Sequence, residues 1–353
     1  MAKMKATKDK KELKVVFLTP YLYSIRGNAT TAKRLTQALS REGVSVKVAS
    51  YEEESYEKIK ELIAESDIVH ALHVRRFVEW LSETGIKITQ PLLLTSGGTD
   101  VNVDFKDPDK LKEMKDIILQ SSGITVFTQD GKEKVLRSFP ESKGKVHIIP
   151  QGIHLEDNKE MDMQLPAGCP KILLPAGLRP VKDVLYLGEA LVSLRKVFPD
   201  LQFAIIGADL DEKTFQEVKK WDLQYKWFHY WEPIPLDRMS TLYEWADIVV
   251  NTSSSEGQPM AVLEAMAWGT PVLARNIPGN KSVIFHGSNG YLFNNAEEFM
   301  EQCKTLMAST ELQHKFISGG KKTTSKHHDP SEEAKAYLYL YKESISKNEE
   351  NKG

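Results

Sequence analysis

The chain has 353 residues, of which 41% are hydrophobic and 27% are charged, and its formal net charge is −2 at pH 7. A chain of this length exceeds what one hydrophobic core usually supports, so two domains of about 150 residues each are expected. The composition is that of a globular protein and excludes a largely disordered chain. Because the net charge is small, nucleic acid is not an expected partner.

The cysteine content and the apolar runs bear on the cellular compartment. Cys169 and Cys303 are too far apart in sequence to suggest a disulfide framework or a metal-ligand cluster, which favours a reducing compartment. Lysines precede the apolar run 15–18 as in a secretion signal, but Pro20 interrupts that run and no small-residue cleavage site follows, so a buried strand is the favoured interpretation. No segment approaches the roughly 18 apolar residues that span a bilayer. We therefore expect a cytoplasmic protein without a transmembrane segment.

The first half of the chain alternates short apolar runs with longer amphipathic stretches, which predicts parallel strands joined by crossover helices. Residues 30–41 form the clearest helix, with Ala32, Leu35, Ala38 and Leu39 on one face, and Gly43 is expected to end it. Strands are predicted at 14–19, 44–50, 68–71, 91–95, 124–128 and 146–149.

The second half repeats the pattern, so the fold class is α/β with two similar sheets. Residues 151–170 are polar and carry Pro166, Gly168 and Pro170, which indicates a linker. The lysine-rich residues 1–12 are expected to form a flexible basic tail rather than a contact with an anionic membrane surface. Strands are predicted at 171–176, 201–206, 227–230, 248–251 and 271–274, and a last long helix at about 331–347.

The most informative segment runs from Asn251 to Pro271 and predicts strand, loop, helix and strand in that order. Pro259 suits the first turn of a helix because its φ is already helical and its missing N–H has no partner there. The helix is expected over 259–268, with Met260, Leu263 and Ala267 as its inward stripe and Gly269 ending it.

A helix that begins directly after a glycine-containing loop presents unpaired N–H groups and the positive end of its dipole, which together bind phosphate. Glu256 lies in that loop and Glu264 lies about one and a half turns into the helix. Carboxylates accept hydrogen bonds from paired hydroxyls, so one glutamate could meet a sugar and the other a ribose. The alternative is that both are solvated glutamates of an ordinary strand–helix–strand unit.

The segment resembles the Glu-x7-Glu motif of retaining glycosyltransferases with two Rossmann-like domains, the GT-B architecture, in the large group called family 4 or group 1. That resemblance implies that Glu256 lies near the donor sugar and its reacting phosphate, and that Glu264 binds the ribose. The neighbouring donor-binding residues it implies are Gly257, Gln258, Pro259 and Met260.

A second matching segment, residues 174–183, lies at the first strand-to-helix turn of the second sheet. It contains Gly177, Arg179 and Lys182. A departing nucleotide diphosphate gains negative charge in the transition state, and fixed cations stabilise that charge in place of a metal. Family members commonly space the arginine and the lysine further apart, so the role of Lys182 is carried over less directly than that of Arg179.

Three segments of the first half lie where open α/β sheets place their ligands, at the carboxyl ends of strands. The resemblance makes Gly27 the glycine of the first turn, where the backbone approaches the donor or the acceptor closely, and Gly27 and Asn28 are expected to bind the donor. Many family members carry a catalytic histidine in the loop matching 96–99, where this chain has glycines. His73 either substitutes for it or is a packed structural residue. The acceptor-side or cleft residues are Arg75, Gly97, Gly98, Asp100 and Asn102.

The strings around Ala71-Leu-His73 and Gly97-Gly-Thr-Asp100 are similar to the subgroup named glycosyltransferase 1 domain-containing proteins. The resemblance covers about 14–293 and implies that the last helix crosses back to the first domain. The predicted units are an N-terminal acceptor-side domain at 13–160, a C-terminal nucleotide-sugar-binding domain at 161–325, and a C-terminal helix at 326–348.

Several features of the sequence bear on the alternatives to a retaining, metal-independent glycosyltransferase. Asp107-Pro-Asp109 and Asp209-Leu-Asp211 fit the Asp-x-Asp string of metal-dependent transferases, but Asp209 and Asp211 more simply cap the next helix, so no metal is predicted. Neither half has the Gly-x-Gly-x-x-Gly string of an NAD-dependent oxidoreductase, and no cofactor is predicted. A GT-B epimerase or phosphorylase, and a nucleotide-sugar-binding or regulatory protein without turnover, remain open. The sequence specifies neither the nucleotide base, the sugar, the acceptor nor the oligomeric state.

Overall fold

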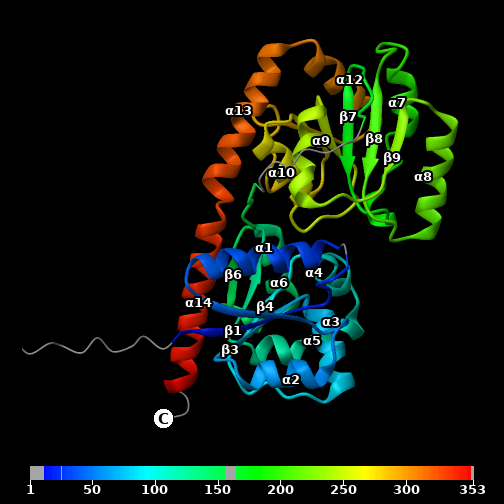
Figure 1. Ribbon diagram of the computed structural model, residues 1–353. Helices are drawn as coiled ribbons and strands as arrows, with labels where there is room; N and C mark the ends of the chain where they lie inside the picture. The colour runs from blue at the N-terminus through cyan, green and yellow to red at the C-terminus, as the bar shows by residue number, and fades with distance from the viewer. Residues whose placement is uncertain (1–11, 25, 156–163, 351–353) are drawn as a thin grey trace, which may run out of the picture.

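The computed structural model describes residues 12–24, 26–155 and 164–350. It contains two six-stranded parallel sheets, each flanked by helices, and the two units lie one above the other (Figure 1). Residues 1–11 of the predicted basic tail and residues 156–163 of the predicted linker lie outside the described residues. The predicted α/β class is therefore confirmed.

The first sheet has the strand order β2-β1-β3-β4-β5-β6, and all its strands are parallel. Each of the six predicted strands is present, with ends that differ by at most two residues. Their bounds are β1 Lys14–Thr19, β2 Ser45–Ser50, β3 Ile68–Leu72, β4 Leu92–Thr95, β5 Gly123–Val126 and β6 Val146–Ile148.

Helices cover both faces of this sheet. Helix α1 buries the predicted face of Ala32, Leu35, Ala38 and Leu39, but it begins at Gly27, three residues earlier than the apolar pattern predicts. The early start brings the first turn of α1 to the edge of the sheet where β1 ends. The helices are α1 Gly27–Arg41, α2 Tyr56–Ala64, α3 Val74–Thr84, α4 Thr99–Asn102, α5 Pro108–Gln120 and α6 Gln129–Ser138, with 3-10 turns at Asp104–Lys106 and Pro140–Ser142.

The second sheet has the order β12-β11-β10-β7-β8-β9 and is also parallel. Its strands are β7 Lys171–Pro175, β8 Gln202–Ile206, β9 Phe228–Trp231, β10 Ile248–Asn251, β11 Val272–Arg275 and β12 Tyr291–Phe293. The first five match predicted strands. Strand β12 was not predicted, because three residues at a sheet edge carry too little periodic signal.

The helices of the second unit begin with a 3-10 turn, η3, at Pro180–Lys182. Asp209 and Asp211 were both expected to cap the helix α8, Glu212–Gln224. Asp211 does so by accepting a hydrogen bond from the Thr214 N–H, whereas Asp209 lies outside the cap. Asp107 likewise caps α5. The helical elements that follow η3 in the second unit are α7 Gly188–Leu194, α8 Glu212–Gln224, η4 Leu236–Arg238, α9 Met239–Trp245, α10 Met260–Trp268, α11 Pro278–Lys281, α12 Ala296–Met307 and α13 Thr310–His327.

The predicted last helix is present as α14, Pro330–Glu350. Helix α13 runs beside the second unit and α14 continues beside the first, where it packs on α1 (Figure 1). The hydroxyl of Tyr341 forms a 2.7 Å hydrogen bond with Nδ1 of the buried His70, and the hydroxyl of Tyr337 lies 3.3 Å from Oγ1 of Thr95. The end of the chain therefore ties the two units together. No helix among the described residues is long and apolar enough to cross a membrane.

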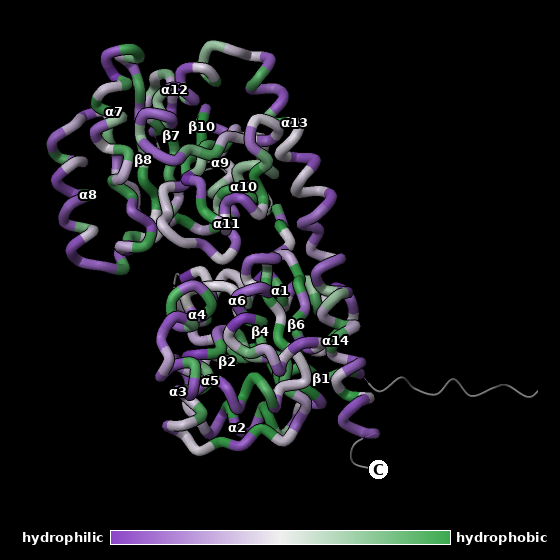
Figure 2. Tube along the Cα trace, turned by 180° about the vertical axis from the view of Figure 1, so that it is seen from behind, coloured by the Kyte–Doolittle hydropathy of each residue, from purple (hydrophilic) through white to green (hydrophobic). Residues whose placement is uncertain are grey.

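Apolar residues gather on the strands and polar residues on the outer helix faces (Figure 2). Strand β1 is buried from Val15 onward, as expected for a parallel strand covered on both faces. Because all strands of a sheet are parallel, the loops that follow them collect at one edge. In both units that edge faces the other unit, which creates a cleft between them.

Candidate functional site

A cavity of about 220 Å³ lies in this cleft and is lined by loops of both units. His73 follows β3 and Gly97 follows β4, while Pro175 ends β7 and Asn251 ends β10. A second cavity of about 160 Å³ adjoins it, and shares Gly27, Lys182 and Glu256 with it. The site is therefore built from the carboxyl ends of strands in both sheets.

Helix α10 begins at Met260 with Pro259 as its N-cap residue, and Gly269 ends it in the left-handed region at φ 89°. The predicted inward stripe is wrong in two of its three residues. Leu263 is buried, but Met260 and Ala267 are only half-buried, because α13 covers the opposite face of the helix. Met260 instead lines the cavities beside the start of the helix. The buried residues are Val262, Leu263, Ala265 and Met266.

Glu256 is held in the loop before α10 by an ion pair. Its Oε1 atom accepts hydrogen bonds from Lys182 Nζ at 2.6 Å, from Ser253 Oγ at 2.7 Å and from Asn251 Nδ2 at 3.2 Å. Burial alone would raise the pKa of Glu256, but the charge of Lys182 and these three hydrogen bonds together hold that pKa below its ordinary value. Glu256 is therefore an ionised carboxylate at neutral pH, with its second oxygen left for a ligand.

Two cations follow β7. Lys182 ends η3, and loop residues after β10 brace that turn: Thr252 Oγ1 donates to the carbonyl of Lys182 at 2.9 Å, and Ser254 N donates to that of Val181 at 2.9 Å. Arg179 is exposed and lines both cavities. Gly177 lines a third cavity, toward the end of β8, where an added Cβ would meet Leu210 at 2.9 Å.

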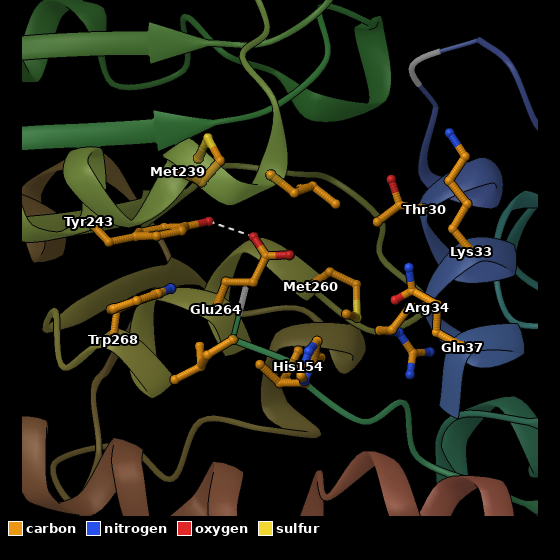
Figure 3. Close-up of a pocket in the computed structure, with 13 residues that line it drawn as sticks. Thr30, Lys33, Arg34, Gln37, His154, Met239, Tyr243, Met260, Glu264 and Trp268 are labelled. Atoms are coloured by element: carbon orange, nitrogen blue, oxygen red, sulfur yellow. Dashed lines mark hydrogen bonds between the residues drawn. The ribbon is translucent and has the colours of Figure 1, made fainter. Parts of the chain in front are cut away.

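Glu264 faces a pocket between α10, α9 and the first unit (Figure 3). Its Oε2 atom accepts a 2.7 Å hydrogen bond from the hydroxyl of Tyr243. Burial raises the pKa of Glu264, against a smaller lowering by this hydrogen bond and by the charge of Arg34. Lys33 and Arg34 of α1 lie across the pocket from Glu264 (Figure 3). The pocket thus combines the carboxylate of Glu264, a hydrogen-bond acceptor, with apolar walls formed by Met239, Met260 and Trp268.

The loop after β4 is organised by one buried carboxylate. Asp100 accepts hydrogen bonds from Ser96 Oγ at 2.5 Å, from Gly98 N at 3.0 Å and from Val74 N at 3.2 Å. The last of these bonds fixes the start of α3 beside His73, whose Nδ1 atom lies 4.0 Å from Asp100 Oδ2. His73 has φ 71° and ψ 82°, a left-handed conformation that is unfavourable for residues other than glycine. A strained histidine held beside an aspartate therefore lines the cleft.

The two units touch within the site itself. Asn102 Nδ2 donates to the carbonyl of Glu256 at 3.0 Å, and Gln151 N donates to Gln258 Oε1 at 2.8 Å. In the loop after β4, Gly97 lies close to Phe127, so that a Cβ added at Gly97 would overlap the Phe127 ring. Backbone and side chains of the first unit thus reach the loop that carries Glu256.

Of the residues predicted for the site, all but Arg75 line these cavities. The expectation for Arg75 is wrong because its guanidinium turns to Glu79 on its own helix and lies 3.8 Å from Glu113 on α5. Arg76, about 100° further round α3, lines the cleft instead. The residues found together are Glu256, Arg179, Lys182, His73, Gly27, Asn28, Gly177, Gly257, Gln258, Pro259, Met260, Glu264, Gly97, Gly98, Asp100 and Asn102.

Several further residues of the site were not predicted, and four of them are Tyr243, Asn251, Ser253 and Tyr21. Tyr243 is identified by its hydrogen bond to Glu264 and by its place in the pocket wall, since nothing in the sequence of α9 distinguishes it from a core residue. Asn251 and Ser253 precede Glu256 in a serine-rich loop, so proximity to that residue was the available signal. Tyr21 follows β1, so its position at the carboxyl end of a strand was the signal that could have placed it in the site.

Comparison with known proteins identifies the family. The sequence model described as "Glycosyl transferases group 1" matches residues 157–323. Glycosyltransferase 1 domain-containing protein 1 of Xenopus tropicalis is 32% identical over 340 residues, which cover 93% of this chain and 97% of that protein. The chain belongs to the group 1 glycosyltransferases. It is accordingly a glycosyltransferase, as the Glu-x7-Glu resemblance predicts.

Solved structures of this kind share the fold. HepE of Anabaena, solved in complex with UDP and glucose, superposes with a TM-score of 0.73 at 16% identity over 93% of this chain and 99% of its own. Sucrose-phosphate synthase of Thermosynechococcus elongatus superposes with a TM-score of 0.76 at 17% identity over 95% and 100% of the two chains. The predicted GT-B architecture is confirmed for the group 1 glycosyltransferase described here.

Proposed function

We propose that this glycosyltransferase moves a sugar from a nucleotide diphosphate sugar to an acceptor, with retention of anomeric configuration and without a metal ion or other cofactor. The observation that carries the proposal is the 2.6 Å ion pair between Lys182 and Glu256 at the start of α10, next to Arg179. HepE, which has the same fold, was solved with UDP and glucose, the two parts of such a donor.

The diphosphate is assigned to the second unit. It would lie between Arg179, Lys182 and the N-terminus of α10, where two fixed charges and the helix dipole oppose the negative charge of the leaving group. Among the described residues no carboxylate forms an ion pair with Arg179, although partial burial in the cleft lowers the pKa of Arg179 and the nearby charge of Glu256 raises it. We assign this guanidinium to the ligand. These groups would supply the charge stabilisation for which other glycosyltransferases use a metal ion.

The two glutamates are assigned to opposite ends of the donor. Glu256 would accept hydrogen bonds from the sugar through the oxygen that Lys182 leaves free. Glu264 would accept from the ribose, with Tyr243 holding its other oxygen in place. His73, positioned by Asp100, would face the sugar and the acceptor from the first unit. The acceptor hydroxyl would then attack the face from which the diphosphate leaves, through an oxocarbenium-like sugar.

Release of nucleotide diphosphate tests the proposal. The purified chain is incubated with UDP-, GDP- and ADP-sugars, with and without EDTA, and the anomeric configuration of any new glycoside is read by NMR. The proposal expects release from one nucleotide family, unchanged by EDTA, with an axial or equatorial linkage matching that of the donor. Inversion, or dependence on a divalent cation, would contradict the mechanism.

The glycine loop also supports a second candidate, a nucleotide-sugar-binding protein without turnover. The loop 96–99, in which the family resemblance places a catalytic histidine, has glycines here, and a Cβ added at Gly97 would meet the ring of Phe127. This candidate expects the nucleotide sugar to bind in the cleft without release of the diphosphate under any condition. The same incubation, combined with a binding measurement, separates the two functions.

A further inference from the structure

The smaller cleft cavity, of about 160 Å³, has an excess of positive charge. Among its lining residues four are cations, Arg26, Arg76, Arg179 and Lys182, and one is a carboxylate, Glu256. Arg179 and Lys182 belong to the second unit and are assigned above to the donor diphosphate. Arg26 and Arg76 belong to the first unit, on the side where the acceptor would bind. Arg76 lines this cavity, whereas Arg26 lines both it and the neighbouring cavity that contains Gly177, Arg179 and Glu264.

The two arginines of the first unit are gathered on one tyrosine. The guanidinium carbon of Arg26 lies 4.1 Å from the centre of the Tyr21 ring, and that of Arg76 lies 5.3 Å from it. Arg76 Nη1 also donates to the Tyr21 hydroxyl at 2.8 Å. Cation–π contacts with Tyr21 hold both side chains at this cavity. Two cations that line one cavity favour the binding of an anion there.

Little negative charge opposes this pair. Arg76 Nη1 lies 3.3 Å from Glu52, but both side chains are more than one third exposed, so that ion pair is weak. Arg26 makes no ion pair with any residue the structure describes. Glu256, the one carboxylate in the lining, is already paired with Lys182. Arginine forks match the geometry of phosphate oxygens, and the charged hydrogen bonds they form are strong.

We propose that the acceptor carries a phosphate group, which Arg26 and Arg76 bind while its hydroxyl reaches the donor sugar near Glu256 and His73. The inference rests on the proposed transferase function and adds the chemical class of its second substrate. The phosphate could belong to a small phosphorylated molecule or to a lipid headgroup, since both present the same group to the arginines.

Calorimetric titration with glycerol 3-phosphate tests the site, with glycerol as the uncharged control. The native chain is expected to bind glycerol 3-phosphate and not glycerol. Arg26→Gln should weaken the binding about tenfold or more, because one charged hydrogen-bonding partner is lost. Arg137→Gln, which changes an exposed arginine at the end of α6 outside these cavities, should leave it unchanged.

A third variant separates this site from the donor site. Arg179→Gln removes a donor-side cation, so it should retain glycerol 3-phosphate binding if the phosphate lies on Arg26 and Arg76. If Arg179→Gln abolishes the binding while Arg26→Gln keeps it, the phosphate has occupied the diphosphate position and the inference is wrong. Equal effects of Arg26→Gln and Arg137→Gln would also overturn it.

Sedimentation with phosphatidylcholine vesicles, with and without phosphatidic acid, distinguishes the sources of the phosphate. Capture by phosphatidic acid that Arg26→Gln abolishes supports a lipid acceptor, and binding of glycerol 3-phosphate alone supports a soluble one. If neither binds, the acceptor inference is overturned. Stabilisation by a nucleotide diphosphate in that case would leave the proposed function intact, so the two failures are distinguishable.

Discussion

Gly257 of the second unit lies directly against the carbonyl group of Gly97 in the first unit, so that a Cβ added at Gly257 would overlap the Gly97 oxygen. The adjacent Glu256 carbonyl accepts the 3.0 Å hydrogen bond from Asn102, whose own oxygen accepts from Lys134 Nζ at 2.6 Å. The loop after β4 therefore closes on the loop that carries Glu256. Contact between the units depends on the absence of a side chain at this point.

Gly257→Ala is predicted to prevent this close approach. The methyl group would hold the units apart by the width of a carbon atom, and misplacement of about 1 Å at a reacting centre can cost about 100-fold in rate. We expect kcat/KM to fall by at least about tenfold with little change in Tm, because Gly257 lies in the cleft and not in a core. Gly98→Ala, where the added Cβ would lie 3.9 Å from Asp100, should lower kcat/KM less. Equal losses would contradict the role of the Gly97–Gly257 contact.

Lys182→Ala is predicted to lower kcat and to shift its pH dependence. The charge of Lys182 lowers the pKa of Glu256, so its removal raises that pKa and protonates the carboxyl at a higher pH. We expect kcat to fall by about 100-fold or more, by analogy with loss of one charge-stabilising donor. The acid limb of the pH–rate profile should move to higher pH, and Lys182→Arg should restore part of both effects. An unmoved acid limb would show that Glu256 does not need to be ionised.

Tyr243→Phe is predicted to weaken donor binding more than it slows turnover. The hydroxyl bond to Glu264 is lost while the ring remains, so the donor KM should rise about fivefold, the equivalent of about 1 kcal/mol. This bond also lowers the pKa of Glu264, which burial already raises, so donor affinity in the variant should be lost at a higher pH on acidification. Tyr225→Phe, which changes a half-buried tyrosine packed against the second-unit core, is the matched control. A fall in kcat at constant KM would exclude a ground-state binding role for Glu264.

His70 is predicted to make stability depend on pH. It is buried between Thr95 and Tyr341, and burial lowers its pKa from 6.5 to about 3. The unfolded chain therefore takes up this proton first as the pH falls below 6.5, and the free energy of unfolding should drop by about 1.4 kcal/mol per pH unit down to about pH 3. Chemical denaturation of the native chain and of His70→Gln measures this. The free energy of unfolding of the native chain should fall relative to that of His70→Gln as the pH falls. A difference that does not change with pH would contradict the assignment.

The sequence predicts those parts of the fold whose residues repeat a simple pattern. Strands β1 and β10 have the bounds that their apolar runs indicate, because parallel strands covered on both faces are apolar throughout. The inward stripe of α10 was predicted wrongly because the pattern of one helix does not reveal that α13 covers its far side. A helix that is apolar on several faces has no single periodic stripe.

In the candidate site, too, some residues could be predicted from a local pattern and others could not. Glu256 and Glu264 were found from their spacing, since the motif lies on one loop and one helix. Tyr243 and Tyr21 were missed because their neighbours in the site come from distant parts of the chain. Arg75 was preferred to Arg76 wrongly, since the start of α3 fixes which of two adjacent side chains faces the cleft, and the Asp100 bond to Val74 helps to set that start.

The most direct test of a nucleotide-sugar transferase is a thermal-shift series with UDP, GDP, ADP and their sugar conjugates, in EDTA and in magnesium, with NAD as the control. We predict that one nucleotide family raises Tm equally with and without the metal, and that Arg179→Ala reduces this rise. Stabilisation by NAD alone, or no stabilisation by any nucleotide, would contradict the assignment of the cleft to a nucleotide diphosphate sugar.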